Sequence, residues 1–296
     1  MENFTPQHFR EKGLFALFGQ AGVLYFKSAK FLAVMTILSF LPVFVFRLFL
    51  PAHLAYAFAE FQALLQYYLA GGEIYMASLM AAAEGDATIY TFMHAGVWLA
   101  FLPLMVGATT YLAARHLDGE SPNFSDMLAN AMPRFPAMLA TLAIVAVIMV
   151  GLLFLTGGTF LVAIPIYIAV TIMFFMHVTA DVGRWGFNAL SISRFLVRGR
   201  WFRVLFFALF ILVAYGAVYL AINVFGGILG VSASLFAELP FFLISQLILS
   251  YFLLVFALWY FDIKTLHQRN LEAVEKMVSD TLREIMERRD NDDSKL

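Results

Sequence analysis

The chain has 296 residues, of which 62% are hydrophobic and 13% are charged. Soluble domains carry about 25% charged residues, so this composition excludes a soluble domain. The formal net charge is −1, and the chain lacks the basic soluble surface that nucleic-acid binding requires. It contains no cysteine, which excludes disulfides and thiolate ligands. We expect neither a metal nor a cofactor.

Residues 1–30 are predicted to form an amphipathic segment at the membrane interface. The apolar stretch Gly13–Phe26 is interrupted by glycines and followed by the charges of Lys27 and Lys30. It is therefore too short and too interrupted to span a bilayer, and it does not resemble a cleavable signal peptide.

Six later stretches reach the roughly 20 mostly apolar residues that a spanning helix needs. In chain order they are Phe31–Leu50, Phe92–Ala114, Pro136–Leu155, Phe160–Ala180, Arg203–Val224 and Leu239–Phe261. Gly157-Gly158 predicts a tight turn between the third and the fourth. The sequence thus predicts an all-α polytopic membrane protein, with a six-helix transmembrane domain over residues 31–262.

The positive charges predict how the chain is threaded. With one exception, the 19 Lys and Arg residues fall within residues 10–30, 115–134, 184–203 and 264–295. Cytoplasmic loops retain Lys and Arg, whereas translocated loops lack them. We therefore expect both termini in the cytoplasm and the protein in the cytoplasmic (inner) membrane of a bacterium. The loop over residues 51–91 would be extracytoplasmic, with two short helices in the outer leaflet.

Residues 263–296 have a different character and are predicted to form a cytoplasmic helical tail. Apolar residues recur there at a spacing of about 3.5 among many charges: Leu271, Val274, Val278 and Ile285. This pattern is typical of an amphipathic helix or a short coiled coil. Residues 264–289 are therefore a candidate for binding a cytoplasmic protein partner or for self-association.

Three segments share one plan, in which a short amphipathic stretch precedes basic residues and a spanning helix. The amphipathic stretches are Leu14–Phe26, Phe124–Met132 and Phe187–Leu196. This repeat predicts three two-helix units, each with an interfacial helix at the cytoplasmic surface.

The third segment carries a family resemblance. It reads Gly186-Phe-Asn-Ala-Leu-Ser-Ile-Ser-Arg-Phe-Leu-Val-Arg-Gly-Arg-Trp-Phe-Arg-Val-Leu. It resembles the A-L-x-x-S-x-x-L-x-x-G pattern, followed by a tryptophan, of a bacterial six-span group. That group includes the membrane domain attached to some glycerophosphodiester phosphodiesterases and the YciC-like and DUF975-like membrane proteins. The resemblance covers most of residues 10–262 and implies a six-span fold; it implies no catalytic residue, because a phosphodiesterase domain does not accompany it.

Six basic residues near the predicted inner ends of the helices form what we call the basic ring: Lys27, Lys30, Arg134, Arg198, Arg200 and Arg203. If the three units pack around one axis, these charges meet at the headgroup level and could hold the phosphate of a membrane phospholipid. Each would contribute about 1 kcal/mol near an anionic surface. The same charges could instead only orient the helices, and both interpretations stay open.

His177 and Asp181 lie four residues apart on one face of the fourth predicted helix. Such a pair could relay protons or bind a cation; it could equally be a satisfied pair at a helix end. No dinucleotide, P-loop, metalloprotease or hydrolase motif is present, and we expect a protein that is not an enzyme.

Two functions remain open from the sequence. The first is an integral membrane protein that binds or moves lipid or another hydrophobic anionic cargo. The second is a non-transporting accessory or scaffold protein, which docks a cytoplasmic partner through its C-terminal helix.

Overall fold

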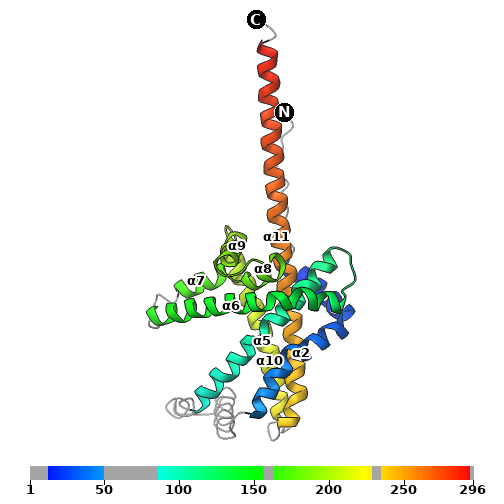
Figure 1. The fold of residues 1–296 in the computed structure, drawn as a ribbon, viewed down its shortest axis with the longest axis vertical. Helices are drawn as coiled ribbons and strands as arrows, with labels where there is room; N and C mark the ends of the chain where they lie inside the picture. The colour runs from blue at the N-terminus through cyan, green and yellow to red at the C-terminus, as the bar shows by residue number, and fades with distance from the viewer. Residues whose placement is uncertain (1–12, 50–85, 157–162, 229–234, 294–296) are drawn as a thin grey trace.

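The computed structural model of the protein describes residues 13–49, 86–156, 163–228 and 235–293. Over these ranges the chain forms α-helices joined by short turns, with no β-strand. The helices are α1 (Leu14–Lys27), α2 (Ala29–Phe49), α5 (Asp86–Leu117), α6 (Phe124–Thr156), α7 (Ala163–Thr171), α8 (Phe175–Val182), α9 (Phe187–Val197), α10 (Trp201–Ile228) and α11 (Leu235–Asp293) (Figure 1).

Within the described ranges, six segments are long and apolar enough to cross a membrane. They are Ala29–Phe46, Met93–Leu117, Phe124–Leu152, Ala163–Val182, Trp201–Gly226 and Leu239–Gln268. Each overlaps one predicted span, so the all-helical class and the six apolar segments are confirmed. The short helices predicted for the 51–91 loop and the Gly157-Gly158 turn fall outside the described residues.

The core forms where α2, α5, α10 and α11 pack together. Trp259 and Tyr260 of α11 are almost completely buried. Trp259 stacks on Phe207 of α10 with the ring centroids 3.9 Å apart, and Phe40 of α2 stacks on Trp98 of α5 at 6.2 Å. Aromatic pairs buried between helices contribute about 0.5–1.5 kcal/mol beyond the area they bury, so these stacks help to join α10 to α11 and α2 to α5.

The N-terminal helix α1 lies against this bundle, as the amphipathic pattern predicts. The Tyr25 hydroxyl donates to the Leu247 carbonyl at 3.0 Å, and the Tyr251 hydroxyl donates to the Phe18 carbonyl at 3.0 Å. Burial raises the pKa of Tyr25 above its usual value. On the opposite face Phe26 is 79% exposed, so α1 buries one side and leaves another for lipid or headgroups.

The structure differs from the prediction for the second repeated segment. Phe124–Met132 was expected to be a separate interfacial helix, but it is the first part of the long helix α6. Pro133 and Pro136 lie inside α6 without ending it. Apolar helices tolerate proline where neighbouring groups satisfy the freed backbone carbonyls. In the same way, the predicted tail is the direct continuation of α11, which runs unbroken to Asp293.

The fourth predicted span is one helix in the sequence analysis and two in the structure. It divides at residues 172–174 into α7 and α8. The buried Ser193 hydroxyl of α9 accepts from the Phe174 amide at 3.1 Å and donates to the Thr171 carbonyl at 3.3 Å. A break inside an apolar helix exposes backbone groups that must find partners, and α9 supplies one side chain for two of them.

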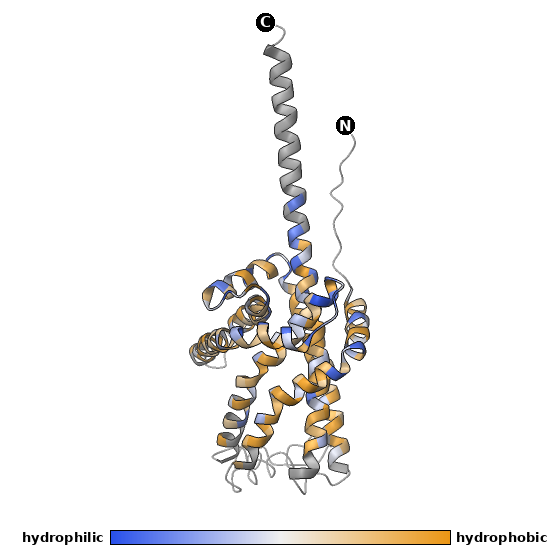
Figure 2. Ribbon diagram, turned by 45° about the vertical axis from the view of Figure 1, so that its right-hand side comes forward, coloured by the Kyte–Doolittle hydropathy of each residue, from blue (hydrophilic) through white to orange (hydrophobic). Residues whose placement is uncertain are grey.

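The helices α6 and α7 differ in direction from α2, α5 and α10. In Figure 1, α6 and α7 run crosswise to α11, whereas α2, α5 and α10 extend toward the end of the molecule opposite the projecting part of α11. Hydrophobic residues predominate along the helices of the bundle (Figure 2). Much of α6 is apolar and uncovered, with Val147 73% and Leu155 79% exposed. Six parallel crossings therefore remain a prediction, as does the three-unit arrangement.

Candidate functional site

A cavity of about 150 Å³ lies between α5, α6, α8 and α11. By this measure of volume, a cavity needs about 10–15 Å³ to hold one water molecule, so this cavity has room for a phosphate group. It sits where the apolar segments of α5 and α6 meet their polar ends. Its polar lining residues are Thr110, Tyr111, Arg115, Asn130, Arg134 and Asp181.

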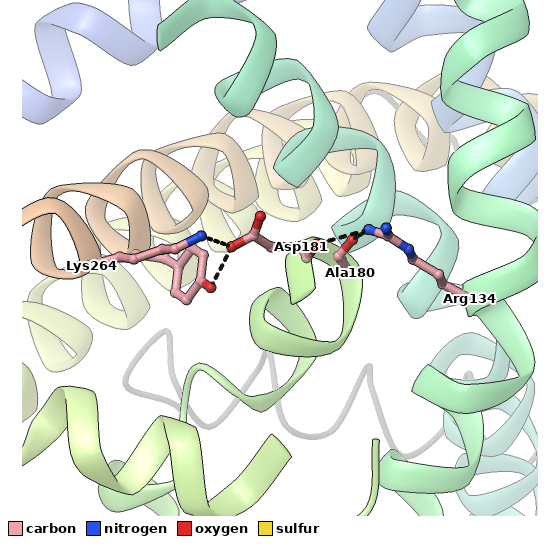
Figure 3. A network of polar contacts seen from close by, with 5 residues as sticks. Arg134, Ala180, Asp181 and Lys264 are labelled. Carbon is pink, nitrogen blue, oxygen red and sulfur yellow. Dashed lines mark hydrogen bonds and ion pairs between the residues drawn. The ribbon is translucent and has the colours of Figure 1, made fainter. Parts of the chain in front are cut away.

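Arg134 joins α6 to the end of α8. Its Nη1 group donates to the backbone carbonyl of Ala180 and, at 3.0 Å, to that of Asp181 (Figure 3). Carbonyls in the last turn of a helix lack partners within the helix and carry its negative dipole end, and α8 ends at Gly183, whose φ is +74°. The guanidinium therefore satisfies the end of α8. Within the described ranges it forms no ion pair with a carboxylate.

Asp181 is held by two side chains of α11. Its Oδ2 atom accepts from the Tyr260 hydroxyl at 2.7 Å and pairs with Lys264 Nζ at 2.5 Å (Figure 3). The Asp181 side chain is 18% exposed and that of Lys264 is 30% exposed. Because Tyr260 and Lys264 are four residues apart, they lie on one face of α11. Lys264 compensates the charge of Asp181.

Arg115 is the second guanidinium at the cavity, from the last turn of α5. It forms an ion pair with Glu120 and lies over the Tyr111 ring, 5.4 Å from its centroid. The Tyr111 hydroxyl is buried and has no hydrogen-bond partner among the described residues. Neither Arg115 nor Tyr111 belongs to a site predicted from the sequence.

The structure gathers only part of the basic ring. Arg134 lines the cavity together with Arg115. The other five members lie at the α1–α2 and α9–α10 junctions and do not line it: Lys27, Lys30, Arg198, Arg200 and Arg203. The two arginines of the cavity therefore come from α5 and α6, which follow one another in the chain, and not from three repeated units.

His177 and Asp181 share α8 but are not hydrogen-bonded to each other. His177 is 5% exposed, and neither ring nitrogen has a partner in the described part of the chain. Its ring stacks on Tyr260 with centroids 5.7 Å apart. Tyr260 therefore touches both residues, His177 through its ring and Asp181 through its hydroxyl. A proton or cation role for the pair stays a prediction.

The chemistry that this arrangement offers is anion binding. Over the described ranges, no group of three or more His, Asp or Glu residues could hold a metal ion.

Comparisons with protein-family models, with curated proteins and with solved structures gave no match, so the resemblance to the six-span group stays an expectation. Fold and site define an all-helical protein with six helices fit to cross a membrane and an arginine-lined cavity at one end of its apolar region.

Proposed function

We propose that this protein is a multi-pass membrane protein that binds lipid by its headgroup phosphate, and so holds or moves lipid or another hydrophobic anionic cargo. The observation that carries the proposal is the pair of guanidinium groups, Arg115 and Arg134, at one cavity. Guanidinium groups are weakly hydrated, planar donors that match the oxygens of phosphate. By the positive-inside rule, this end faces the cytoplasm of a bacterial cell.

The surface beside the cavity suits the rest of a lipid molecule. α6 leads away from the cavity and exposes apolar side chains along its length, with Met132 48% and Val150 66% exposed. A lipid whose phosphate enters the cavity would lay its acyl chains along this surface. Burial of apolar area contributes about 25 cal/mol per Å², so the chains would supply affinity and the arginines would fix the position of the headgroup.

The experiment compares lipid retention in charge-neutralising variants. Arg134→Gln and Arg115→Gln are purified with wild type, and bound phospholipid is measured by mass spectrometry. A hydrogen bond to a charged group contributes about 1.5–3 kcal/mol, so Arg134→Gln is expected to lose roughly tenfold or more in retention. Arg115→Gln should lose less, because Arg115 already pairs with Glu120. Arg194→Gln is the control, because Arg194 is an exposed cation on α9. Unchanged retention in both cavity variants would contradict the proposal.

A second candidate function rests on the length of α11. This helix continues beyond the apolar segment that ends at Gln268 and projects from the bundle in Figure 1. The apolar spacing after residue 270 favours pairing with another copy of the chain. Truncation after Asn270 keeps the Lys264 contact and should convert a self-associating protein into a monomer in light scattering. An unchanged molar mass would rule out this function for the helix.

A further inference from the structure

The cavity is surrounded by charges that are unequally compensated. Asp181 is paired with Lys264 and Arg115 with Glu120. Arg134 donates to two backbone carbonyls, which are dipoles without net charge. Among the described residues that line the cavity or pair with its lining, one positive charge therefore lacks a negative partner.

The position of Glu120 follows from the backbone at the end of α5. The amide of Gly119 donates to the His116 carbonyl at 3.2 Å, and the amide of Glu120 donates to the Arg115 carbonyl at 2.9 Å. Together with the φ of +74° at Gly119, these two bonds form a Schellman motif. This motif returns Glu120 to the turn that carries Arg115. The backbone thus brings Glu120 close to Arg115, with which its carboxylate forms the ion pair.

The two main classes of lipid phosphate differ in charge. A phosphodiester headgroup link carries one negative charge at neutral pH. A phosphomonoester, such as a phosphatidate or a polyprenyl phosphate, carries about −1.5 to −2 because its second pKa is near 6. A single uncompensated guanidinium matches the first class. The extra charge of the second class would lie near the carboxylates of Glu120 and Asp181.

We infer that Glu120, by occupying Arg115, makes this cavity selective for phosphodiester lipids over phosphomonoester lipids. The inference rests on the proposed lipid-binding function and identifies the ligand class of that site. Glu120 acts here as a specificity residue at the rim: its side chain is 54% exposed, and that of Arg115 is 33% exposed. The pair is therefore open enough for a phosphomonoester to compete with Glu120 for Arg115. This competition costs free energy of binding in the wild-type protein, and it would not do so with a neutral side chain at position 120.

The test uses the full-length protein in nanodiscs of phosphatidylcholine that contain either phosphatidylglycerol or phosphatidic acid, with bound lipid quantified by native mass spectrometry. Wild type should retain phosphatidylglycerol in preference to phosphatidic acid. Glu120→Gln should raise retention of phosphatidic acid by about three- to fivefold, the size expected for an exposed pair, and leave phosphatidylglycerol nearly unchanged. Glu272→Gln, which neutralises an exposed carboxylate far along α11, is the matched control.

Four outcomes would overturn the inference. Wild type could prefer phosphatidic acid, or Glu120→Gln could change both lipids equally; in either case, continued loss of lipid in Arg134→Gln would leave the proposed function intact. If Arg134→Gln and Arg115→Gln retain both lipids as the wild type does, the inference and the proposed function are both wrong. Inorganic phosphate added to the same samples should displace neither lipid, and displacement would show that a free anion is the ligand.

Discussion

Asp181 of α8 and Lys264 of α11 form an ion pair that joins the broken fourth apolar segment to the helix that leaves the bundle. Arg134 reaches the same residue from α6 and binds its backbone carbonyl (Figure 3). One residue thus connects α6, α8 and α11 beside the cavity. A movement of α6 or α11 relative to α8 would displace at least one of these contacts, so Asp181 links the packing of these three helices.

Replacing Asp181 with Asn should destabilise the protein by about 1–2 kcal/mol. The two donors on α11 would lose a charged acceptor, and the partial exposure of the pair keeps the loss below that of a fully buried ion pair. Chemical unfolding in detergent, followed by circular dichroism, measures the change. Asp118→Asn alters an exposed aspartate in the α5–α6 turn and should have little effect. Equal changes in the free energy of unfolding for the two substitutions would contradict this role of Asp181.

Replacing His177 with Phe should leave stability unchanged or raise it slightly. Both imidazole nitrogens are buried without a partner in the described residues, and an unsatisfied buried polar group costs about 1–3 kcal/mol. The aromatic ring of Phe retains the stack on Tyr260. Thermal unfolding and lipid retention should be measured together. Normal stability with lost lipid retention would show that His177 takes part in lipid binding and would contradict a purely structural role.

The six apolar segments could be predicted from the sequence because a run of about 20 apolar residues has few alternatives. The break between α7 and α8 could not. No Gly or Pro lies at residues 172–174, and the side chain that compensates the break, Ser193, lies on another helix. Local periodicity carries no information on such a contact.

The cavity was predictable only in part. Arg134 was included in the basic ring because it is a cation near a predicted helix end. Arg115 and Arg134 face one cavity because α5 and α6 pack against each other. In the sequence, the short turn between these two helices was the available sign that their ends lie side by side. Grouping the charges by repeated units places Arg134 with the other members of the basic ring, which do not line the cavity.

Replacing Ser193 with Ala should cost about 1–3 kcal/mol of stability. The substitution removes one hydroxyl that serves two backbone groups at the α7–α8 break, and buried groups left without a partner carry their full desolvation penalty. The same unfolding assay applies. Ser191→Ala lies on α9 at an exposed position and should be neutral, so the expected result is a difference between two serines of one helix. Two neutral substitutions would mean that the break does not depend on α9.

Cysteine labelling tests whether α6 is surrounded by lipid. The chain has no native cysteine, so single-cysteine variants report one position each. Val147→Cys, at a site that is 73% exposed, should resist a membrane-impermeant maleimide from both sides of the membrane. Asp118→Cys should react in inverted vesicles and not in intact spheroplasts. Reaction of Val147→Cys from the cytoplasmic side would show that the crosswise α6–α7 pair faces water.

The central claim is that the cavity between α5, α6, α8 and α11 holds a lipid phosphate. An experimental density map of the full-length protein in nanodiscs that contain phosphatidylglycerol tests it most directly. The account predicts headgroup density within hydrogen-bond distance of Arg134 and Arg115, with acyl density along α6. An ordered lipid headgroup found only at Arg198 and Arg203, above an empty cavity, would contradict it.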